Sequence, residues 1–209
     1  MPSFLPRLND SPQLAVILAS TSPRRQELLA ALAARFTVVS PDFAEVWDGQ
    51  ESPEAYVQRN AQGKAASVGH KAANQAQTHE TLVIAADTIC ELDGKILEKP
   101  ESPAGAEAML AHLSGRTHRV YSGLSLHYRA KNHPPKTLTQ SVMTEVTFKA
   151  LSPQEIHAYV ATGEPMDKAG SYAAQGLGAY MVQSIKGSYT NIIGLPLCEL
   201  YLSCQKILA

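Results

Sequence analysis

Short apolar runs alternate with amphipathic segments along the first half of the chain. Residues 14–19 (LAVILA) and 81–86 (TLVIAA) are apolar runs of strand length. The segments 24–36 and 52–70 instead repeat their apolar residues at helical spacing, and Ser-Pro pairs precede both. This order of strands and helices predicts an α/β fold.

The second half of the chain contains a predicted hairpin and long strands, which can pair antiparallel without a helical crossover between them. Asp93-Gly94, between two short strand-like segments, predicts a hairpin. Further predicted elements are a helix from Ser102-Pro103 to Gly115, strands at 118–128 and 138–149, a helix opened by the capping box 152–155, and a C-terminal helix in 195–208. Residues 70–80 and 163–194 read as loop and as irregular structure. The hairpin and the long strands favour a mixed sheet.

Composition limits the class of protein. The 209 residues suit a single domain over residues 14–209, preceded by a loose extension at residues 1–13. The net charge of −1 argues against a protein that binds nucleic acid in general. No apolar run has the length of a membrane span, and the N-terminus lacks the apolar centre of a signal peptide. Three cysteines, Cys90, Cys198 and Cys204, read as small core residues in a reducing, cytoplasmic setting.

The hexapeptide STSPRR (residues 20–25) is the first candidate for chemistry. A helix that starts at Ser22-Pro23 would present free N–H groups and a positive dipole end. Arg24 and Arg25 in the first turn oppose that dipole, a conflict that a bound phosphate would resolve. The alternative interpretation is a simple helix cap with solvated arginines.

Asp87 follows the apolar run 81–86, and we expect the strand to end there. A carboxylate at the end of a buried strand is a frequent metal ligand or base in α/β proteins, whereas the alternative is a turn that leaves the strand. Glu45, Lys64 and Lys99 by themselves read as ordinary surface residues.

The segment 163–176 is rich in special residues. It offers a carboxylate at Asp167, an ammonium at Lys168 and an amide at Gln175. An amide can bind the edge of a nucleobase through paired hydrogen bonds. The alternative is a tight loop with an internal Asp167–Lys168 pair.

Six segments in order carry a resemblance to a known family: LASTSPRRQELL (18–29), AADTI (85–89), GKILEKP (94–100), LSGRTHRVYSG (113–123), GEPMDKAGSYAAQG (163–176) and GSYTNIIGLPL (187–197). With them the chain resembles the Maf family of nucleoside triphosphate pyrophosphatases. The resemblance implies an elongated mixed sheet flanked by helices, with two lobes and a cleft between them. It also implies hydrolysis between the α- and β-phosphates, a divalent cation (Mg²⁺ or Mn²⁺) and a homodimer.

The same resemblance assigns roles to individual residues. Asp87 matches the residue that activates the attacking water, and Glu45 and Asp87 match the metal ligands, which Asp167 would assist. The residues that match phosphate-binding positions are Ser20, Arg24, Arg25, Lys64, Lys99 and Lys168.

Substrate preference follows from three positions. Arg24, Thr88 and Gln175 match the branch that acts on dTTP and UTP, although Ala173-Ala174 stands where that branch has Gly-Ile. The alternatives are a pyrophosphatase for 7-methyl-GTP or a modified uridine nucleotide, and a nucleotide-binding regulator of septum formation with little turnover.

Overall fold

The computed structural model describes residues 14–33, 35–47, 49–75, 80–130 and 133–209. The predicted extension, residues 1–13, lies outside the described residues. The helices are α2 (Pro23–Ala30), α3 (Pro53–Gln75), α4 (Pro103–Leu113), α5 (Pro153–Ala161), α6 (Tyr189–Ile193) and α7 (Leu197–Leu208). Three short 3₁₀ helices lie between α5 and α6: η1 (Glu164–Asp167), η2 (Ala169–Ser171) and η3 (Leu177–Met181).

The strands form a mixed sheet, as the sequence predicted. They are β1 (Leu14–Leu18), β2 (Thr37–Val38), β3 (Glu80–Leu92), β4 (Lys95–Leu97), β5 (Thr117–Arg129), β6 (Lys136–Phe148) and β7 (Val182–Lys186). The order along the sheet is β2-β1-β3-β5-β6-β7, and β4 pairs with β3. β1 runs parallel to both β2 and β3, whereas the pairs β3–β4 and β6–β7 are antiparallel.

Two compact units divide these elements. The first contains residues 1–87, 122–142 and 194–209, and the second contains residues 88–121 and 143–193. The strands β3, β5 and β6 each contribute residues to both units. The single domain predicted for residues 14–209 stays a prediction.

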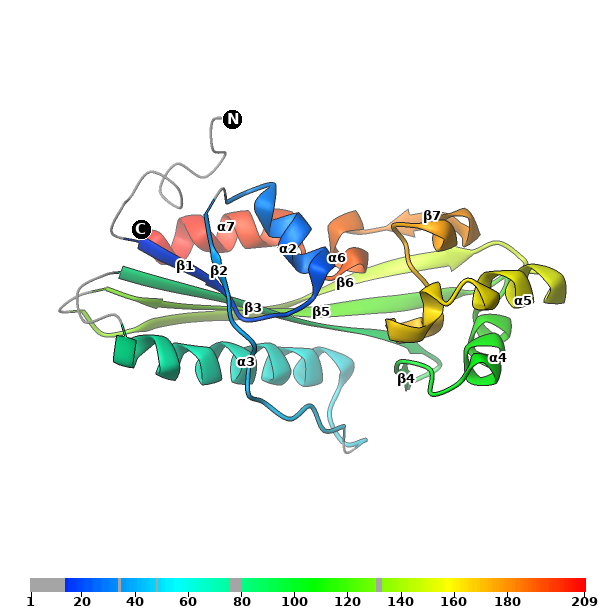
Figure 1. The fold of residues 1–209 in the computed structure, drawn as a ribbon, viewed down its shortest axis with the longest axis horizontal. Helices are drawn as coiled ribbons and strands as arrows, with labels where there is room; N and C mark the ends of the chain where they lie inside the picture. Colours follow the sequence, from blue (N-terminus) through cyan, green and yellow to red (C-terminus); the bar gives the residue numbers. More distant parts are fainter. Residues whose placement is uncertain (1–13, 34, 48, 76–79, 131–132) are drawn as a thin grey trace. The chain divides into compact units, whose positions relative to one another are not determined.

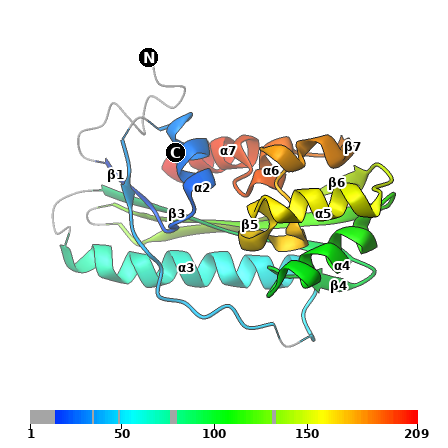
Figure 2. The ribbon, with the colours of Figure 1, turned by 45° about the vertical axis from the view of Figure 1, so that its right-hand side comes forward.

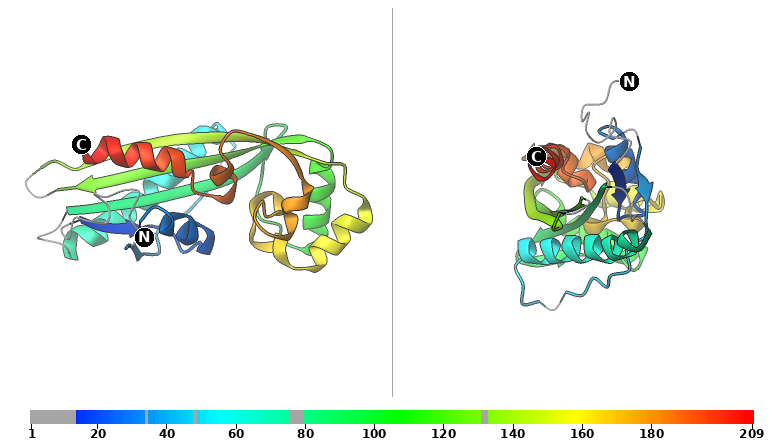
Figure 3. Two further views of the ribbon diagram at one scale, coloured as in Figure 1. Left: turned by 90° about the horizontal axis from the view of Figure 1, so that it is seen from above. Right: turned by 90° about the vertical axis from the view of Figure 1, so that its left-hand side faces the viewer.

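Helices cover both faces of the sheet in the first unit. α3 lies against one face, and α2 and α7 lie against the other (Figures 1 and 3). Side chains of β3 point alternately to the two faces of the sheet. Leu82 and Ile84 pack with α2 and α7, while Val83 and Ala85 pack against α3. The direction in which each β3 side chain points is thereby fixed up to Asp87.

Close contact between α3 and β5 depends on a glycine in the first unit. A Cβ atom on Gly123 would lie 1.9 Å from the carbonyl oxygen of Val57. Any other residue would push the helix away from the strand. The packed distance between α3 and the sheet, which positions the inward side chains of α3, therefore requires glycine at this position.

The second unit has its own core beneath α4 and α5, which lie side by side in Figure 2. Ser152 and Glu155 form the predicted capping box at the start of α5. Ser102 caps α4 by accepting a hydrogen bond from the Gly105 N–H. Buried residues from the helices and the strands fill the space between them, among them Leu110, Leu113, Val120, Val146, Phe148, Ile156 and Tyr159.

Four sequence predictions about local structure are wrong. The helix expected over residues 24–36 is shorter, because α2 ends at Ala30. α3 continues to Gln75, so residues 71–75 are helical rather than loop. β3 does not end at Asp87 but continues to Leu92, because β-branched and apolar residues follow the carboxylate. Cys198 is exposed near the start of α7, whereas Cys90 and Cys204 are buried as predicted. Among the described residues, no helix is long and apolar enough to cross a membrane.

His118, in β5, is buried in the second unit. Its Nε2 lies 2.9 Å from the Tyr172 hydroxyl, and among the described residues its Nδ1 has no hydrogen-bond partner. Burial lowers the pKa of His118 from 6.5 to about 4. The folded protein therefore holds this imidazole neutral while the unfolded chain takes up a proton.

We expect His118 to make stability fall as the pH drops. Between pH 6.5 and pH 4 the unfolded state binds the proton first, so the free energy of unfolding falls by up to about 3 kcal/mol through this group. Above pH 6.5 the effect is absent. Urea unfolding of wild type and of His118→Gln at pH 7 and pH 4.5 measures it. Equal pH dependence in both proteins would show that His118 is not responsible.

Candidate active site

Asp87 lies on the face of the sheet that α3 covers. Because side chains alternate along β3, Asp87 points to the same face as Val83 and Ala85. It is 4% exposed, so its carboxylate needs partners inside the protein. The partners come from α3.

Asn60 and Lys64 supply those partners from one face of α3. They are four residues apart, which places both toward the sheet, and both are buried. The Asn60 Nδ2 donates to Asp87 Oδ2 at 2.9 Å, and the Lys64 Nζ donates to Asp87 Oδ1 at 2.6 Å. Both oxygens of the carboxylate are thus held in a fixed orientation.

Lys64 also contacts a second carboxylate. Its Nζ lies 2.7 Å from Glu45 Oε1, and the Glu45 side chain is 46% exposed. One ammonium group therefore lies between a buried and a half-exposed carboxylate. The predicted metal ligands Glu45 and Asp87 are brought together by the structure, around a single positive charge.

Charge rather than burial decides the ionisation of Asp87. Burial by itself raises the pKa of this carboxyl, but the charge of Lys64, the hydrogen bonds from Lys64 and Asn60, and the charge of Arg25 together lower it. Asp87 is therefore ionised at neutral pH. An ionised, oriented carboxylate can bind a cation or accept a proton from water.

The start of α2 forms the other part of the site in the first unit. Leu18 pairs with Ile84 in parallel register, so the chain after β1 runs beside the part of β3 that leads to Asp87. Ser22 occupies the N-cap position without a side-chain cap, and the first turn contains no acidic residue. The Ser22 side chain therefore does not compete with an anion for the N–H groups of this turn.

Ser20 and Arg25 are held together beside this helix start. The Ser20 Oγ accepts hydrogen bonds from the Ser22 N–H at 3.2 Å and from the Arg25 Nη1 at 3.4 Å. The Arg25 Nε donates to the carbonyl oxygen of Gly194 at 2.8 Å. This bond and the bond to Ser20 hold the guanidinium, which carries five N–H donors, beside the helix start.

Burial lowers the pKa of Arg25, and the charges of Asp87 and Glu45 oppose that shift. The guanidinium keeps its proton at neutral pH. Its electrostatic coupling to Asp87 and Glu45 places the predicted phosphate-binding cation and the predicted metal ligands in one electrostatic environment. Arg24 is half-buried in the same turn.

The residues of the first unit fit a hard divalent cation. The described residues contain no group of three or more His, Cys, Asp or Glu side chains that could hold a metal by themselves. Two carboxylates that already share an ammonium match the way Mg²⁺ is usually bound, with one or two carboxylates and the phosphates of a substrate. The donor set therefore fits Mg²⁺ or Mn²⁺ together with a phosphate ligand.

The remaining predicted residues belong to the second unit. Thr88 follows Asp87 in β3 and is half-buried, while Lys99 is exposed just after β4. Gln175 is exposed in the loop before η3. The Lys168 Nζ donates to Asp167 Oδ1, at 2.5 Å, which is the internal pair that the sequence left open as an alternative.

Sequence reasoning missed Asn60 and the carbonyl of Gly194. Asn60 is completely buried and bonds directly to the candidate catalytic carboxylate. A signal was present, because Asn60 and Lys64 are polar residues four positions apart on the inward face marked by Val57 and Ala61. A backbone acceptor such as Gly194 leaves no such signal.

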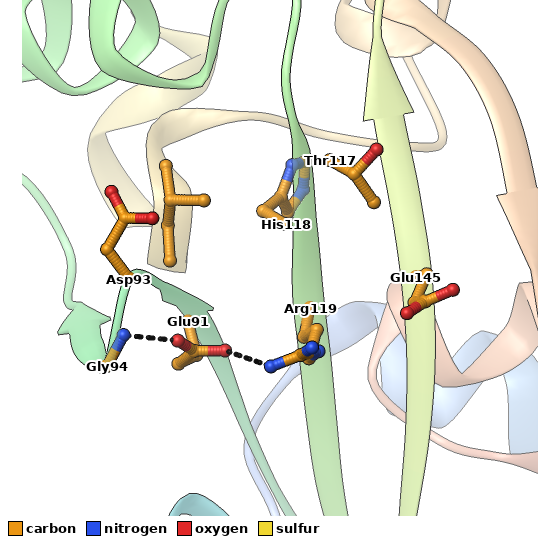
Figure 4. A pocket seen from close by; sticks show the side chains of 8 residues that line it. Glu91, Asp93, Gly94, Thr117, His118, Arg119 and Glu145 are labelled. Carbon is orange, nitrogen blue, oxygen red and sulfur yellow. Dashed lines mark hydrogen bonds and ion pairs between the residues drawn. The ribbon is translucent and has the colours of Figure 1, made fainter.

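A separate hollow in the second unit contains none of the predicted residues. It measures about 360 Å³ and is lined by Glu91, Leu92, Asp93, Gly94, Thr117, His118, Arg119 and Glu145 (Figure 4). Glu91 Oε1 accepts a hydrogen bond from the Gly94 N–H at 2.6 Å, and Oε2 lies 3.7 Å from Arg119. These contacts hold the turn between β3 and β4, so Glu91 and Arg119 have a structural role here.

Comparison with known proteins identifies the family to which this chain is similar. The family model described as Maf-like protein matches residues 15–207. The dTTP/UTP pyrophosphatase of Geotalea uraniireducens is 46% identical over 184 residues, covering 88% of this chain and 90% of that protein. The dTTP/UTP pyrophosphatase of Clostridium perfringens strain 13 is 44% identical over 189 residues, covering 90% and 94%. A solved HAM1 protein from Coxiella burnetii has a TM-score of 0.45 and 17% identity, covering 92% and 99%.

Proposed function

The chain belongs to the Maf family, and on that basis we propose that it hydrolyses dTTP and UTP to the nucleoside monophosphate and pyrophosphate. Relatives with 44–46% identity carry the name dTTP/UTP pyrophosphatase. The observation that carries the proposal is the buried Asp87 carboxylate, bonded by Lys64 and Asn60 and coupled to Arg25. An ionised acid among cations suits a reaction that brings water to a polyanion.

We assign phosphate binding to positively charged side chains, Ser20 and the start of α2. In the first unit Ser20, Arg24, Arg25 and Lys64 bind phosphate oxygens, with the N–H groups of the first turn of α2. In the second unit Lys99 and Lys168 have the same role. Phosphate hydrolysis depends mainly on positioning and on stabilising negative charge, so these groups supply much of the rate enhancement.

Asp87 orients the attacking water and accepts its proton. With Lys64 bonded to it, the pKa of Asp87 is lowered, which makes the carboxylate a weak base. When the Lys64 ammonium turns to a phosphate oxygen, Asp87 Oδ1 is released from its hydrogen bond and becomes available to the attacking water. Substrate binding then prepares the base for the reaction.

Glu45 and Asp87 would hold the divalent cation, Mg²⁺ or Mn²⁺. When bound, this ion supplies Lewis-acid stabilisation of the phosphate oxygens. The Lys64 ammonium, 2.7 Å from Glu45 and 2.6 Å from Asp87, supports the assignment because the two carboxylates already accommodate one positive charge. Asp167, exposed beside Lys168, is a further oxygen donor.

Base selection is the role of Arg24, Thr88 and Gln175. Uracil and thymine present two carbonyl groups and one N–H on the pairing edge, and the Gln175 amide offers both a donor and an acceptor to match them. Cytosine presents a different pattern on that edge. We therefore expect discrimination between UTP and CTP.

A nucleotide panel tests the function. Pyrophosphate release is measured with Mg²⁺ or Mn²⁺ for dTTP, UTP, CTP, GTP, 7-methyl-GTP and a modified uridine triphosphate. We expect dTTP and UTP to have the highest kcat/KM, and Gln175→Ala to reduce the preference for UTP over CTP. A preference for 7-methyl-GTP or a modified uridine nucleotide would replace the substrate assignment. Tight binding without release of pyrophosphate would favour the regulator of septum formation. The homodimer and the cytoplasmic location stay predictions.

A further inference from the structure

The loop that carries Gln175 is held from both ends by two residues outside it. We propose that Glu164 and Tyr159 are positioning residues for base selection, because they fix the backbone on either side of Gln175. The inference rests on the proposed function, in which Gln175 binds the base. All of the residues involved belong to the second unit.

Glu164 holds the segment after Gln175. Its Oε1 accepts a hydrogen bond from the Leu177 N–H at 3.0 Å, and its Oε2 accepts one from the Gly178 N–H at 2.9 Å. Two consecutive backbone N–H groups are thus bound by one carboxylate. This arrangement fixes the path of the chain as it enters η3.

Tyr159 holds the segment before Gln175 and connects it to Glu164. Its hydroxyl donates to Glu164 Oε2 at 2.7 Å and accepts a hydrogen bond from the Ala173 N–H at 3.0 Å. Tyr159 is 3% exposed near the end of α5. The connected bonds Ala173–Tyr159–Glu164–Leu177 therefore bracket Gln175 two residues before and two residues after it.

Two glycines show how closely the loop approaches this pair. A Cβ on Gly176 would lie 2.4 Å from Glu164 Oε1, and Gly176 has φ +134°, which side chains rarely tolerate. A Cβ on Gly178 would lie 2.7 Å from both the Tyr159 hydroxyl and the Ala173 carbonyl oxygen. The loop conformation and the two positioning side chains therefore fit together at contact distance.

Glu164 is itself anchored in its charged form. Burial by itself raises the pKa of Glu164. The hydrogen bonds from Tyr159, Leu177 and Gly178 and the charge of Lys168 outweigh burial, so the pKa is lowered overall. The Lys168 Nζ also donates to the Glu164 carbonyl oxygen at 2.6 Å. Hydrogen bonds to an ionised carboxylate are stronger than neutral ones, so the carboxylate is a firm anchor.

The exposed side chain of Gln175 depends on this anchor. An amide distinguishes uracil from cytosine only if its donor and acceptor keep a fixed orientation. Because Gln175 projects from the segment between Ala173 and Leu177, its orientation follows that backbone. Removing the hydrogen bonds of Glu164 or Tyr159 should therefore reduce the preference for UTP over CTP more than it reduces the rate of hydrolysis at Asp87.

The test compares selectivity with turnover. In Glu164→Gln an NH₂ group replaces one acceptor oxygen and faces a backbone N–H or the Tyr159 hydroxyl. In Tyr159→Phe the ring remains and both hydroxyl bonds are lost. For each variant we expect kcat/KM for UTP relative to CTP to fall about tenfold or more, mainly through a higher KM for UTP, with kcat within about threefold of wild type.

Matched controls are Glu101→Gln and Tyr189→Phe, which make the same substitutions at exposed residues just before α4 and in α6 and should leave the ratio unchanged. Gln175→Ala is measured alongside. If wild type prefers UTP, Gln175→Ala loses the preference, and both positioning variants keep it, the inference is overturned while the function stands. A wild type without a UTP preference contradicts the proposed function itself and with it this inference. If Glu164→Gln fails to fold, Tyr159→Phe decides.

Discussion

Asp87→Asn is expected to lower kcat for UTP by at least about 100-fold, the range typical for loss of a general base. The amide keeps the shape of the side chain but neither accepts a proton from water nor binds a cation strongly. The carbonyl oxygen of the new amide can still accept from the Asn60 Nδ2, but its NH₂ group then faces the Lys64 Nζ, and that hydrogen bond is lost. A large loss of turnover in a folded protein would therefore report on the carboxylate and its ion pair with Lys64.

Steady-state pyrophosphate release at several metal concentrations measures this effect. If Asp87 orients water, kcat stays low at saturating Mg²⁺, and if it also holds the ion, the apparent affinity for Mg²⁺ falls as well. Glu80→Gln is the matched control, since Glu80 begins the same strand outside the proposed site. Turnover of Asp87→Asn close to that of the control would refute the assignment.

Lys64→Met is expected to reduce both activity and stability. The ammonium lies 2.6 Å from Asp87 and its side chain is 9% exposed, so its removal leaves a buried carboxylate without its main counter-charge. Breaking a buried ion pair from one side costs about 3 kcal/mol or more at neutral pH. Phosphate binding also loses one cation, so KM for UTP should rise.

The loss of stability should shrink in acid. In wild type the pKa of Asp87 is lowered by folding, so its contribution is present above the unfolded pKa and disappears as the pH falls through the folded pKa. Without Lys64 that pKa rises, and protonation of Asp87 relieves the unpaired charge. Urea unfolding at pH 7 and pH 4 should show the larger difference from wild type at pH 7. Lys206→Met, at an exposed position of α7, is the control, and an equal loss at both pH values would contradict the account.

Local sequence signals predicted most of the fold. The apolar run at residues 14–19 and the capping box at Ser152 depend only on residues close in sequence. The structure has a strand at 14–18 and a capped helix start at Ser152. Two errors arose where polarity was taken for the end of an element. Residues 71–75 are polar but contain good helix formers, and Asp87 interrupts an apolar strand that continues beyond it.

The site was only partly predictable, for a physical reason. The alternation along β3 and the four-residue spacing on α3 determine that Asp87 and Lys64 face each other, but only once the two elements are packed together. The sequence alone left Lys64 as an ordinary helix-surface residue. Asn60 and the Gly194 carbonyl were missed because their roles arise from tertiary contacts. The same applies to Tyr159 and Glu164.

The bond that is cleaved tests the central claim most directly. Wild-type protein is given UTP and Mg²⁺ in water labelled with a heavy oxygen isotope, and the products are analysed by phosphorus NMR and mass spectrometry. The account predicts UMP and pyrophosphate in equal amounts, with one labelled oxygen in UMP and none in pyrophosphate. UDP with inorganic phosphate, label in the pyrophosphate, or bound UTP that is never hydrolysed would each contradict it.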